Sequence, residues 1–417
     1  MSMINKDVLI NVLPQYQDEI KRMHVLADLD RLPTITVVGK YNHGKSSLLN
    51  ALVGETHFAV ADKRQTRELE RVEADGVCWL DAPGLDADIQ TEDDAYAHHA
   101  AWLEADIRLF VHAAREGELD AVERALLLDL LADEENSHRA VLFVLSQADQ
   151  VASEELLANI RDNIQAQSVS ICPVAVSTMR YQRGIEREQA LFIEKSGIPQ
   201  LQAALTEAIA QVPAKRQIEK ENLFESLSNA LDVLIQAQKG KVKSLKEQAE
   251  QEERAFAAEL KGVLEQAAVD LHDIMQEPEI DEALDPGTID DVYRVTAGKI
   301  ERSKIQNAYS RVCIHIRGTL TRHGVVALPK QQQTGAKGLD TVMVVVMGVS
   351  VKYRADLRRM FGDPAGRKRL YQDFKHYFEQ SQDRITRLET IELSSQELQL
   401  MLSAREELLK WQQLTAC

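Results

Sequence analysis

The eight residues GKYNHGKS at 39–46 constrain the fold of this chain more than any other feature. They match the pattern GxxxxGK[ST], and they stand between an apolar run, TITVVG at 34–39, and the sequence SSLLNALVGE, which is typical of a helix. A glycine-containing turn between a strand and a helix exposes main-chain N–H groups to a phosphate chain, and the helix N-terminus adds its positive dipole. The motif therefore predicts a phosphate-binding domain of the α/β class.

Further short apolar runs, separated mostly by helical sequence, predict the rest of this domain. They lie at 68–74, 76–81, 106–112, 140–146 and 171–177. Strands that alternate with helices predict a largely parallel, doubly wound sheet. Asp75-Gly76 joins the first two runs as a hairpin, so one antiparallel edge strand is expected. The domain is expected over 33–213, closed by a helix that starts near Pro199.

Beyond 214 the strand patterns nearly vanish, and leucine recurs at steps of three and four residues. This periodicity predicts long amphipathic helices, and long helices with short connections predict an all-α bundle over 214–417. An amphipathic helix within 1–32, interrupted at Pro14, is expected to pack on this bundle. The predicted fold is thus an α/β domain followed by a helical bundle.

The segment 324–352 is the least ordinary part of the helical half. A Gly- and Gln-rich stretch precedes an almost wholly apolar run at 342–351. Basic residues flank this run, namely Lys330, Lys337, Lys352, Arg354, Arg358 and Arg359. An apolar insertion beside basic residues is what binding to anionic lipid requires. A core strand or a buried helix turn accounts for the same run equally well.

The composition excludes several classes of protein. The 417 residues are 44% hydrophobic, which is enough to bury a sizeable core. The four cysteines have neither paired nor metal-ligand spacing, so no disulfide framework or zinc site is predicted. A net charge of −17 repels nucleic acid, and no DNA partner is expected. Because neither a signal peptide nor a spanning segment is predicted, the expected location is the cytoplasm, with peripheral membrane contact through 324–359 if lipid is bound.

Several residues are predicted to surround the phosphates and a Mg²⁺ ion. Lys45 is expected to bridge the β- and γ-phosphates, and Ser46 to offer its hydroxyl to Mg²⁺. Asp81 ends an apolar strand where a carboxylate can hold Mg²⁺, while the Gly84 N–H can contact the γ-phosphate. Thr66 is the candidate switch hydroxyl for Mg²⁺, with an ordinary loop threonine as the alternative. The other loop residues expected to contact the nucleotide are Gly39, Asn42, His43, Gly44 and Ser47.

The base is predicted to be bound by SQAD at 146–149, which follows another apolar strand. The Asp149 carboxylate can accept two parallel hydrogen bonds from N1–H and the exocyclic amine of guanine, a donor pair that adenine lacks. GTP and GDP are therefore the expected nucleotides, with Gln147 beside them. The main-chain N–H of Ser177 or Thr178 is expected near guanine O6, unless these residues only cap the end of a strand.

Taken in order, these motifs resemble GTPases of the translation-factor-related class over about 34–213. Two departures from that pattern bear on function. The family's base motif is usually [NT]KxD, whereas Ser146 and Gln147 stand here, so the lysine that lies along the base is missing and lower nucleotide affinity is expected. Leu85 follows Gly84 where Ras-like enzymes place a water-orienting glutamine. Hydrolysis is therefore expected to be organised in another way.

Asn42 offers one such way. In GTPases similar to the Era and MnmE groups, an asparagine at this loop position helps to bind a monovalent cation that compensates charge between the phosphates. The resemblance makes Asn42 a candidate K⁺ ligand and, together with Lys45, Thr66 and Gly84, a candidate catalytic residue. An asparagine that only adopts a left-handed turn conformation is the alternative. No metal besides Mg²⁺ and K⁺ is predicted.

The order of domains resembles that of bacterial dynamin-like proteins, in which a helix before the GTPase domain pairs with helices after it. This resemblance implies GTP hydrolysis, homodimerisation through the GTPase domains or pairing with a related GTPase, and movement of a helical stalk at an anionic membrane. Two alternatives stay open. One is a cytosolic assembly GTPase like Era or EngA that acts on ribosomal RNA, favoured by the basic sequence RKRLYQDFKH at 367–376. The other is a nucleotide-dependent scaffold with negligible hydrolysis.

Overall fold

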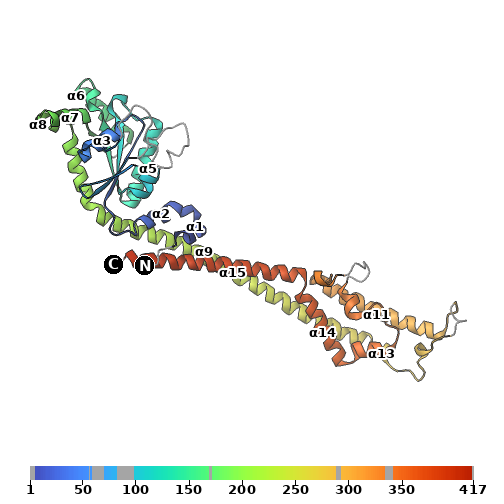
Figure 1. The fold of residues 1–417 in the computed structure, drawn as a ribbon. Helices are drawn as coiled ribbons and strands as arrows, with labels where there is room; N and C mark the ends of the chain where they lie inside the picture. Colours follow the sequence, from blue (N-terminus) through green and yellow to red (C-terminus); the bar gives the residue numbers. More distant parts are fainter. Residues whose placement is uncertain are drawn as a thin grey trace. The chain divides into compact units, whose positions relative to one another are not determined.

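The computed structural model describes residues 5–55, 57–58, 70–81, 98–168, 171–287, 293–333 and 341–415. The chain divides into two compact units. Residues 1–234 and 400–417 form the first, which we call the α/β unit, and residues 235–399 form the second, the helical unit. Two long helices, α9 (Ile198–Asp270) and α15 (Gln382–Thr415), contribute residues to both units (Figure 1).

A six-stranded sheet forms the centre of the α/β unit (Figure 1). Its strands are β1 (Thr34–Val38), β2 (Glu70–Ala74), β3 (Val77–Asp81), β4 (Ile107–Ala113), β5 (Ala140–Ser146) and β6 (Val174–Ala175), in the order β2-β3-β1-β4-β5-β6. All pairs are parallel except β2 with β3. Asp75 and Gly76 join that pair with φ of 52° and 75°, as a two-residue hairpin requires. The predicted sheet with one antiparallel edge is confirmed.

Helices cover both faces of this sheet. On one face, Ile35 and Val37 of β1 pack in the same core as Leu48 of α3 (Lys45–Val53) and Leu201 of α9. On the other face, Phe143 of β5 packs with residues of α5 (Ala121–Ser137) and α6 (Glu154–Ser168). Further helical segments between β3 and α9, among the described residues, are η2 (His99–Glu104), η3 (Ala114–Glu116), η4 (Ala148–Gln150), α7 (Thr178–Glu186) and α8 (Ala190–Glu194).

The N-terminal segment forms two short helices in the α/β unit. α1 (Lys6–Val12) is followed by a turn, η1 (Pro14–Tyr16), and by α2 (Gln17–Val25). The interruption falls at Pro14, as predicted, because proline lacks the N–H that would continue a helix. Leu9, Leu13 and Ile20 are buried, and the indole N–H of Trp411 in α15 donates to the carbonyl of Met23 at 2.9 Å. The segment therefore packs on the parts of α9 and α15 that belong to this unit.

Helix α9 continues past residue 213, where the end of the α/β domain was expected. It runs without a break from Ile198 to Asp270, with Pro213 inside it, and the two compact units divide between 234 and 235 instead. A proline in a helix interior normally costs about 3 kcal/mol. Tertiary contacts on both sides offset this cost, because Val212 is buried in the core and Arg216 pairs with Asp106.

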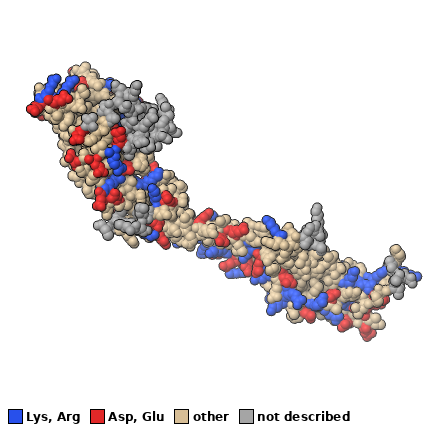
Figure 2. Space-filling model, in the orientation of Figure 1, with Lys and Arg blue, Asp and Glu red and all other residues tan. Residues whose placement is uncertain are grey.

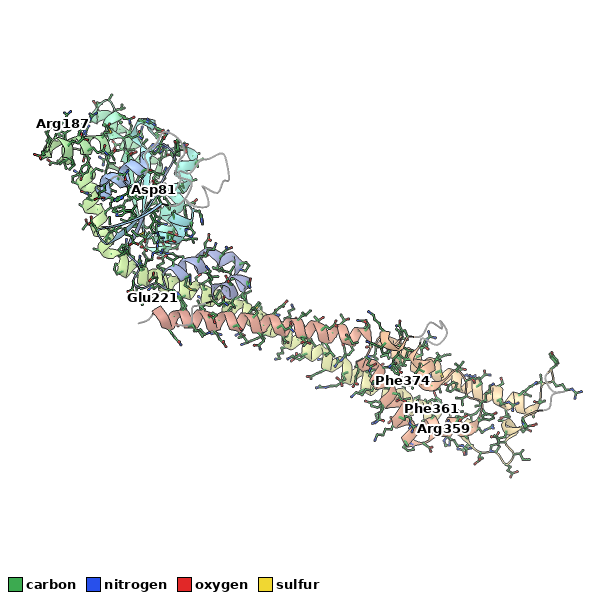
Figure 3. The ribbon with its side chains drawn as sticks, viewed as in Figure 1. Asp81, Arg187, Glu221, Arg359, Phe361 and Phe374 are labelled. Atoms are coloured by element: carbon green, nitrogen blue, oxygen red, sulfur yellow. The ribbon has the colours of Figure 1, made fainter. Side chains whose placement is uncertain are left out.

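The helical unit is built on α9, α11 (Ala297–Arg322), α14 (Pro364–Glu379) and α15. Shorter segments connect them, namely α10 (His272–Met275), η5 (Glu282–Leu284), η7 (Lys330–Gln332), α12 (Val342–Met347), α13 (Arg354–Leu357) and η8 (Arg358–Gly362). Phe361 and Phe374 are fully buried in its core together with Phe256 of α9 and Tyr309 of α11 (Figure 3). The predicted all-α region is confirmed.

The apolar run at 342–351 packs along α11. The Tyr309 hydroxyl donates to the carbonyl of Met347 at 2.7 Å, and the N–H of Val351 donates to Gln306 at 3.0 Å. Val342, Met347 and Val351 are buried in the core of the helical unit, whereas Val345 and Val349 are 52% and 74% exposed. Residues 342–347 thus form the helix turn named above as the alternative, buried at Val342 and Met347, whereas residues 348–350 are exposed. Among the described residues, every helix is too short or too polar to cross a bilayer.

Candidate nucleotide-binding site

The loop at 39–46 connects β1 to α3, as predicted. Gly39, Asn42 and Gly44 have positive φ, at 152°, 61° and 80°. A Cβ atom at Gly39 would lie 2.2 Å from the main-chain oxygen of Val111 in β4, so glycine is required there. Gly44 is the N-cap of α3. The loop thus ends where a helix presents main-chain N–H groups and its positive dipole, which is the arrangement that binds phosphate.

Ser46 and Asp81 meet beside this loop. β1 and β3 are parallel neighbours, with Val37 opposite Asp81, so their carboxyl ends share one edge of the sheet. The Ser46 hydroxyl donates to Asp81 Oδ2 at 2.6 Å. A hydroxyl and a carboxylate are the hard oxygen ligands that Mg²⁺ prefers, so the two predicted ligands fit this ion. Within the loop, Lys45 Nζ donates to the main-chain oxygen of Lys40 at 2.8 Å.

Asp81 is buried at the carboxyl end of β3, where Figure 3 labels it. Burial raises the pKa of Asp81 to about 6, although the Ser46 hydrogen bond and the charge of Lys45 act in the opposite direction. The carboxylate is therefore the main form at neutral pH, and a nearby cation would favour it further. Two other residues predicted to act at this site, Thr66 and Gly84, lie outside the described residues, as does Leu85.

Asp149 and Ser177 lie together after β5 and β6. The Ser177 hydroxyl donates to Asp149 Oδ1 at 2.6 Å and accepts from the N–H of Arg180 at 3.0 Å, which makes Ser177 the N-cap of α7. The Ser177 N–H donates to the carbonyl of Ser196 at 2.8 Å, so the expectation that it reaches guanine is wrong for this amide. Ser177 instead orients the Asp149 carboxylate. The main-chain N–H of Thr178, the first residue of α7, stays the predicted donor to guanine O6.

Ser146 and Gln147 connect the base-binding loop to the phosphate-binding loop. Ser146 Oγ lies 2.6 Å from the main-chain oxygen of His43. Gln147 adopts φ of 55° and donates from Nε2 to the main-chain oxygen of Asn42 at 2.8 Å. Ser146 and Gln147 are the residues that depart from the [NT]KxD motif. Their neutral side chains connect the two loops where the usual motif has a lysine.

Replacing Gln147 with lysine is expected to tighten GDP binding about fivefold. An ammonium donor to the Asn42 carbonyl makes a charge-assisted hydrogen bond, which is stronger than the amide's by about 1 kcal/mol, and its alkyl stem can lie along the base. Calorimetric titration of GDP measures the change. Gln150→Lys adds the same charge in η4, away from this carbonyl, and should leave the affinity within about twofold of the wild type. Equal affinities for the two variants would contradict the prediction.

His43 and Ser47 complete the set of loop residues. Ser47 lies in the first turn of α3. The His43 imidazole is buried, with Nε2 3.2 Å from a carboxylate oxygen of Glu116 and Nδ1 3.3 Å from one of Glu123. A contact of His43 with the nucleotide would therefore come from its main chain. The acidic partners, and His112 beside them, could not be found from the sequence because they belong to no motif.

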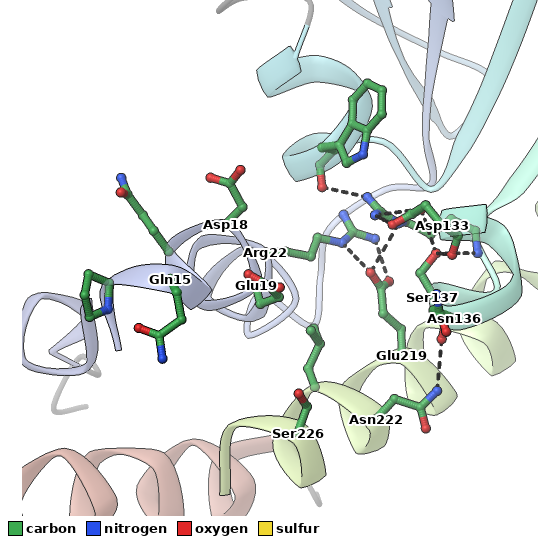
Figure 4. Close-up of a pocket in the computed structure, with 15 residues that line it drawn as sticks. Gln15, Asp18, Glu19, Arg22, Asp133, Asn136, Ser137, Glu219, Asn222 and Ser226 are labelled. Atoms are coloured by element: carbon green, nitrogen blue, oxygen red, sulfur yellow. Dashed lines mark hydrogen bonds and ion pairs between the residues drawn. The ribbon is translucent and has the colours of Figure 1, made fainter. Parts of the chain in front are cut away.

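A separate cleft of about 850 Å³ lies where α2, α5 and α9 meet, near the amino ends of β4 and β5 (Figure 4). Arg22 is at its centre and donates to both carboxylate oxygens of Glu219, at 3.0 and 2.9 Å. A further hydrogen bond from Arg22 reaches Asp106 at 3.0 Å. The phosphate-binding loop does not line this cleft, and the hydrogen bonds of Arg22 fix α2 and α9 to the sheet.

Comparison with known proteins shows a GTPase domain in the α/β unit. A family model described as "50S ribosome-binding GTPase" matches residues 34–171. An uncharacterised protein of Acinetobacter baylyi is 45% identical over 379 residues, covering 91% of this chain and 90% of the relative. GTPase Era of Geotalea uraniireducens is 29% identical over 134 residues, which cover 30% of this chain and 43% of Era. The chain therefore spans less than half the length of this Era protein.

Among solved structures, Aquifex aeolicus Era bound to GDP and AlF₄⁻ has 20% sequence identity and a TM-score of 0.30, over 37% of this chain and 55% of that one. The match to the Acinetobacter protein, in contrast, extends over nearly the whole of both chains. The chain belongs to the same family as that protein, and its α/β unit carries a P-loop GTPase domain related to the GTPases of the Era and Der type.

Proposed function

We propose that this protein binds GTP with Mg²⁺ and hydrolyses it to GDP. One observation carries the proposal: the phosphate-binding loop, the Ser46–Asp81 contact and the Asp149–Ser177 pair all follow strands of one sheet at its carboxyl edge. Open α/β sheets bind their ligands at this edge. Mg²⁺, held by Ser46 and Asp81, would neutralise charge on the β- and γ-phosphates. Lys45, now bonded to the Lys40 carbonyl, is placed to donate to phosphate oxygens instead.

Two substitutions test this proposal by calorimetry and by release of inorganic phosphate. Lys45→Ala removes a charged donor and should weaken GTP binding about 100-fold, equivalent to about 3 kcal/mol. Asp149→Asn replaces the paired acceptors with an amide. That change should shift preference from GTP to xanthosine triphosphate, whose C2 carries a carbonyl where guanine has an amine. The proposal fails if the wild type binds neither GTP nor GDP, or if Lys45→Ala binds GTP as tightly as the wild type.

The role of K⁺ is tested by comparing turnover in KCl and NaCl. We expect faster GTP turnover in KCl, by about tenfold, and we expect Asn42→Ala to abolish the difference, because a cation between the phosphates compensates the charge that develops during hydrolysis. Asn42 does adopt the left-handed conformation of a turn, and its carbonyl accepts from Gln147. The side-chain amide of Asn42 is the group that is predicted to bind K⁺. A wild type with no preference between the two salts would exclude the cation role.

Pairing of two α/β units across the nucleotide is the proposed way to complete the site, since Leu85 stands where other GTPases place a glutamine. Light scattering with GDP and aluminium fluoride, a mimic of the transition state, should report a dimer, whereas GDP alone should leave the monomer. A monomer under both conditions would contradict this part of the proposal. The pairing is the feature that the dynamin-like resemblance predicted.

The expected anionic membrane partner has less support from the structure. Arg354 pairs with Asp281 and Glu301, and Arg358 pairs with Glu277, so these cations are largely neutralised within the chain. On the face shown in Figure 2, Lys and Arg side chains of the helical unit lie among Asp and Glu side chains. The dynamin-like membrane function therefore stays a prediction.

A ribosomal partner is the second candidate, because the matching family model is described as a ribosome-binding GTPase. Sedimentation with 50S subunits and flotation with anionic liposomes, each with and without GTP, separate the two. Val345→Asp is the informative variant for lipid, because Val345 is half-exposed and its replacement leaves the buried Val342 and Met347 in place. Flotation lost in this variant would favour the membrane, whereas GTP-dependent sedimentation that Val345→Asp does not change would favour the ribosome.

A further inference from the structure

Two imidazoles and one carboxylate converge behind the phosphate-binding loop. His43 comes from the loop, His112 from the end of β4, and Glu123 from the first turn of α5. Glu123 Oε1 lies 2.8 Å from His112 Nδ1 and 3.3 Å from His43 Nδ1. All three ligand atoms lie within 4.8 Å of one another, and the three side chains are at most 3% exposed.

The outer nitrogen of each ring lies beside an acceptor to which it can donate. His112 Nε2 lies 3.0 Å from the carbonyl oxygen of Gly117, so a hydrogen on Nε2 is satisfied there. His43 Nε2 lies 3.2 Å from a carboxylate oxygen of Glu116 and can donate to it in the same way. In this tautomer each Nδ1 has a lone pair near Glu123 Oε1, and His43 Nδ1 also lies 3.4 Å from the main-chain oxygen of Val111. Three electron-pair donors then share one buried space.

With both hydrogens on Nε2, a cation is the group that can accept all three lone pairs together. Protons on both Nδ1 atoms would instead place two imidazolium rings 5.2 Å apart, centroid to centroid, in the interior, where burial disfavours each charge and the two repel. One divalent ion satisfies all three lone pairs at once. Two imidazoles and a carboxylate are a donor set of zinc sites, whereas Mg²⁺ prefers oxygen ligands alone.

We propose that His43 Nδ1, His112 Nδ1 and Glu123 Oε1 bind one divalent transition-metal ion of the zinc type, at a site distinct from the Mg²⁺ site of Ser46 and Asp81. The surroundings match those of known metal ligands, because each ring donates its other N–H to a carboxylate or a carbonyl. Glu123 Oε2, the second oxygen of this carboxylate, accepts from the N–H of Asp120 at 3.3 Å and lies 3.8 Å from Lys40 Nζ.

The proposed ion would join three elements that surround the nucleotide. His43 lies in the phosphate-binding loop, and its carbonyl accepts from Ser146 in the base-binding loop. Coordination of His43 by an ion that is also bound to β4 and α5 would therefore hold both loops against the sheet. The site is a structural one in this proposal, and its occupancy can be measured without any nucleotide.

The test uses the full chain, freed of metal with a chelator and kept without nucleotide or Mg²⁺. Zn²⁺ is titrated by calorimetry, and Co²⁺ by its visible absorption. We expect one ion per chain and intense Co²⁺ bands of a tetrahedral site. Glu123→Gln removes a ligand while keeping the Asp120 capping box possible, and should weaken Zn²⁺ binding at least about 100-fold; Glu116→Ala removes an outer partner and should weaken it about tenfold.

His57→Ala is the matched control, because His57 is an exposed histidine beside Glu55 in the same unit. It should bind Zn²⁺ as the wild type does. Should Glu123→Gln fail to fold by circular dichroism, ¹⁵N NMR of the wild-type histidines replaces it, with two Nδ1 resonances expected to shift on addition of one equivalent of Zn²⁺. Binding of less than one equivalent, equal affinity in wild type and Glu123→Gln, or unshifted Nδ1 resonances would overturn the proposal.

Discussion

Replacing Glu219 with alanine is expected to lower the free energy of unfolding by about 3–5 kcal/mol. The reason is that Glu219 and Arg22 form a buried pair with two hydrogen bonds of 3.0 and 2.9 Å, and both side chains are less than 5% exposed. Removal of the carboxylate leaves the Arg22 guanidinium buried with Asp106 as its remaining acidic partner. Arg139, whose Nε lies 3.3 Å from Glu219, also loses a partner.

Urea unfolding of the full chain, followed by circular dichroism, measures this effect. Glu221→Ala is the control, because Glu221 lies two residues further along α9 and is exposed to solvent (Figure 3). Surface substitutions of this kind usually change stability by no more than about 0.5 kcal/mol. If both variants unfold within that margin of the wild type, the network around Arg22 does not stabilise the α/β unit in the way described.

Gly39→Ala is expected to abolish nucleotide binding and to destabilise the protein by about 2–6 kcal/mol. Two costs add up at this position. The backbone has φ of 152°, which side-chain-bearing residues rarely adopt, and the new Cβ would lie 2.2 Å from the carbonyl oxygen of Val111. Because Val111 is a buried residue of β4, the loop rather than the sheet must move. Movement of the loop displaces the N–H groups that would bind phosphate.

Gly54→Ala separates these two costs. Gly54 also has positive φ, 86°, but a Cβ atom at this position would meet no other atom within 4 Å, so only the backbone strain of about 1–2 kcal/mol applies. Chemical unfolding and GDP calorimetry on both variants give the comparison. A Gly39→Ala protein as stable as Gly54→Ala, or one that still binds GDP normally, would show that the contact with Val111 does not position the loop.

The features that could be predicted from sequence depend on residues that are close together in the chain. The phosphate-binding loop needs a strand, a turn with glycines and a helix in succession, and the eight residues at 39–46 with their flanks specify all three. The same holds for the Asp75-Gly76 hairpin and for the interruption at Pro14. Ser46 and Asp81 were each predicted from local sequence to face a Mg²⁺ ion, and the parallel pairing of β1 with β3 brings them within 2.6 Å of each other.

The features that were not predicted depend on contacts between distant residues. His43, His112 and Glu123 come from a loop, a strand and a helix, and their spacing in the sequence does not indicate that they lie together. The run at 342–351 has the composition of a lipid-binding insertion, and only its contacts with α11 show that Val342, Met347 and Val351 are buried in the core.

The sequence by itself determined that this chain contains a Ras-like phosphate-binding domain followed by long helices, because local backbone geometry and periodic burial are encoded by neighbouring residues. Only the tertiary structure decided that α9 continues through Pro213 and that Arg22 forms an ion pair with Glu219. It also decided that the Ser177 N–H donates to the carbonyl of Ser196. In each of these cases the free energy comes from burial and pairing with residues far away in the chain, which can outweigh the local preference.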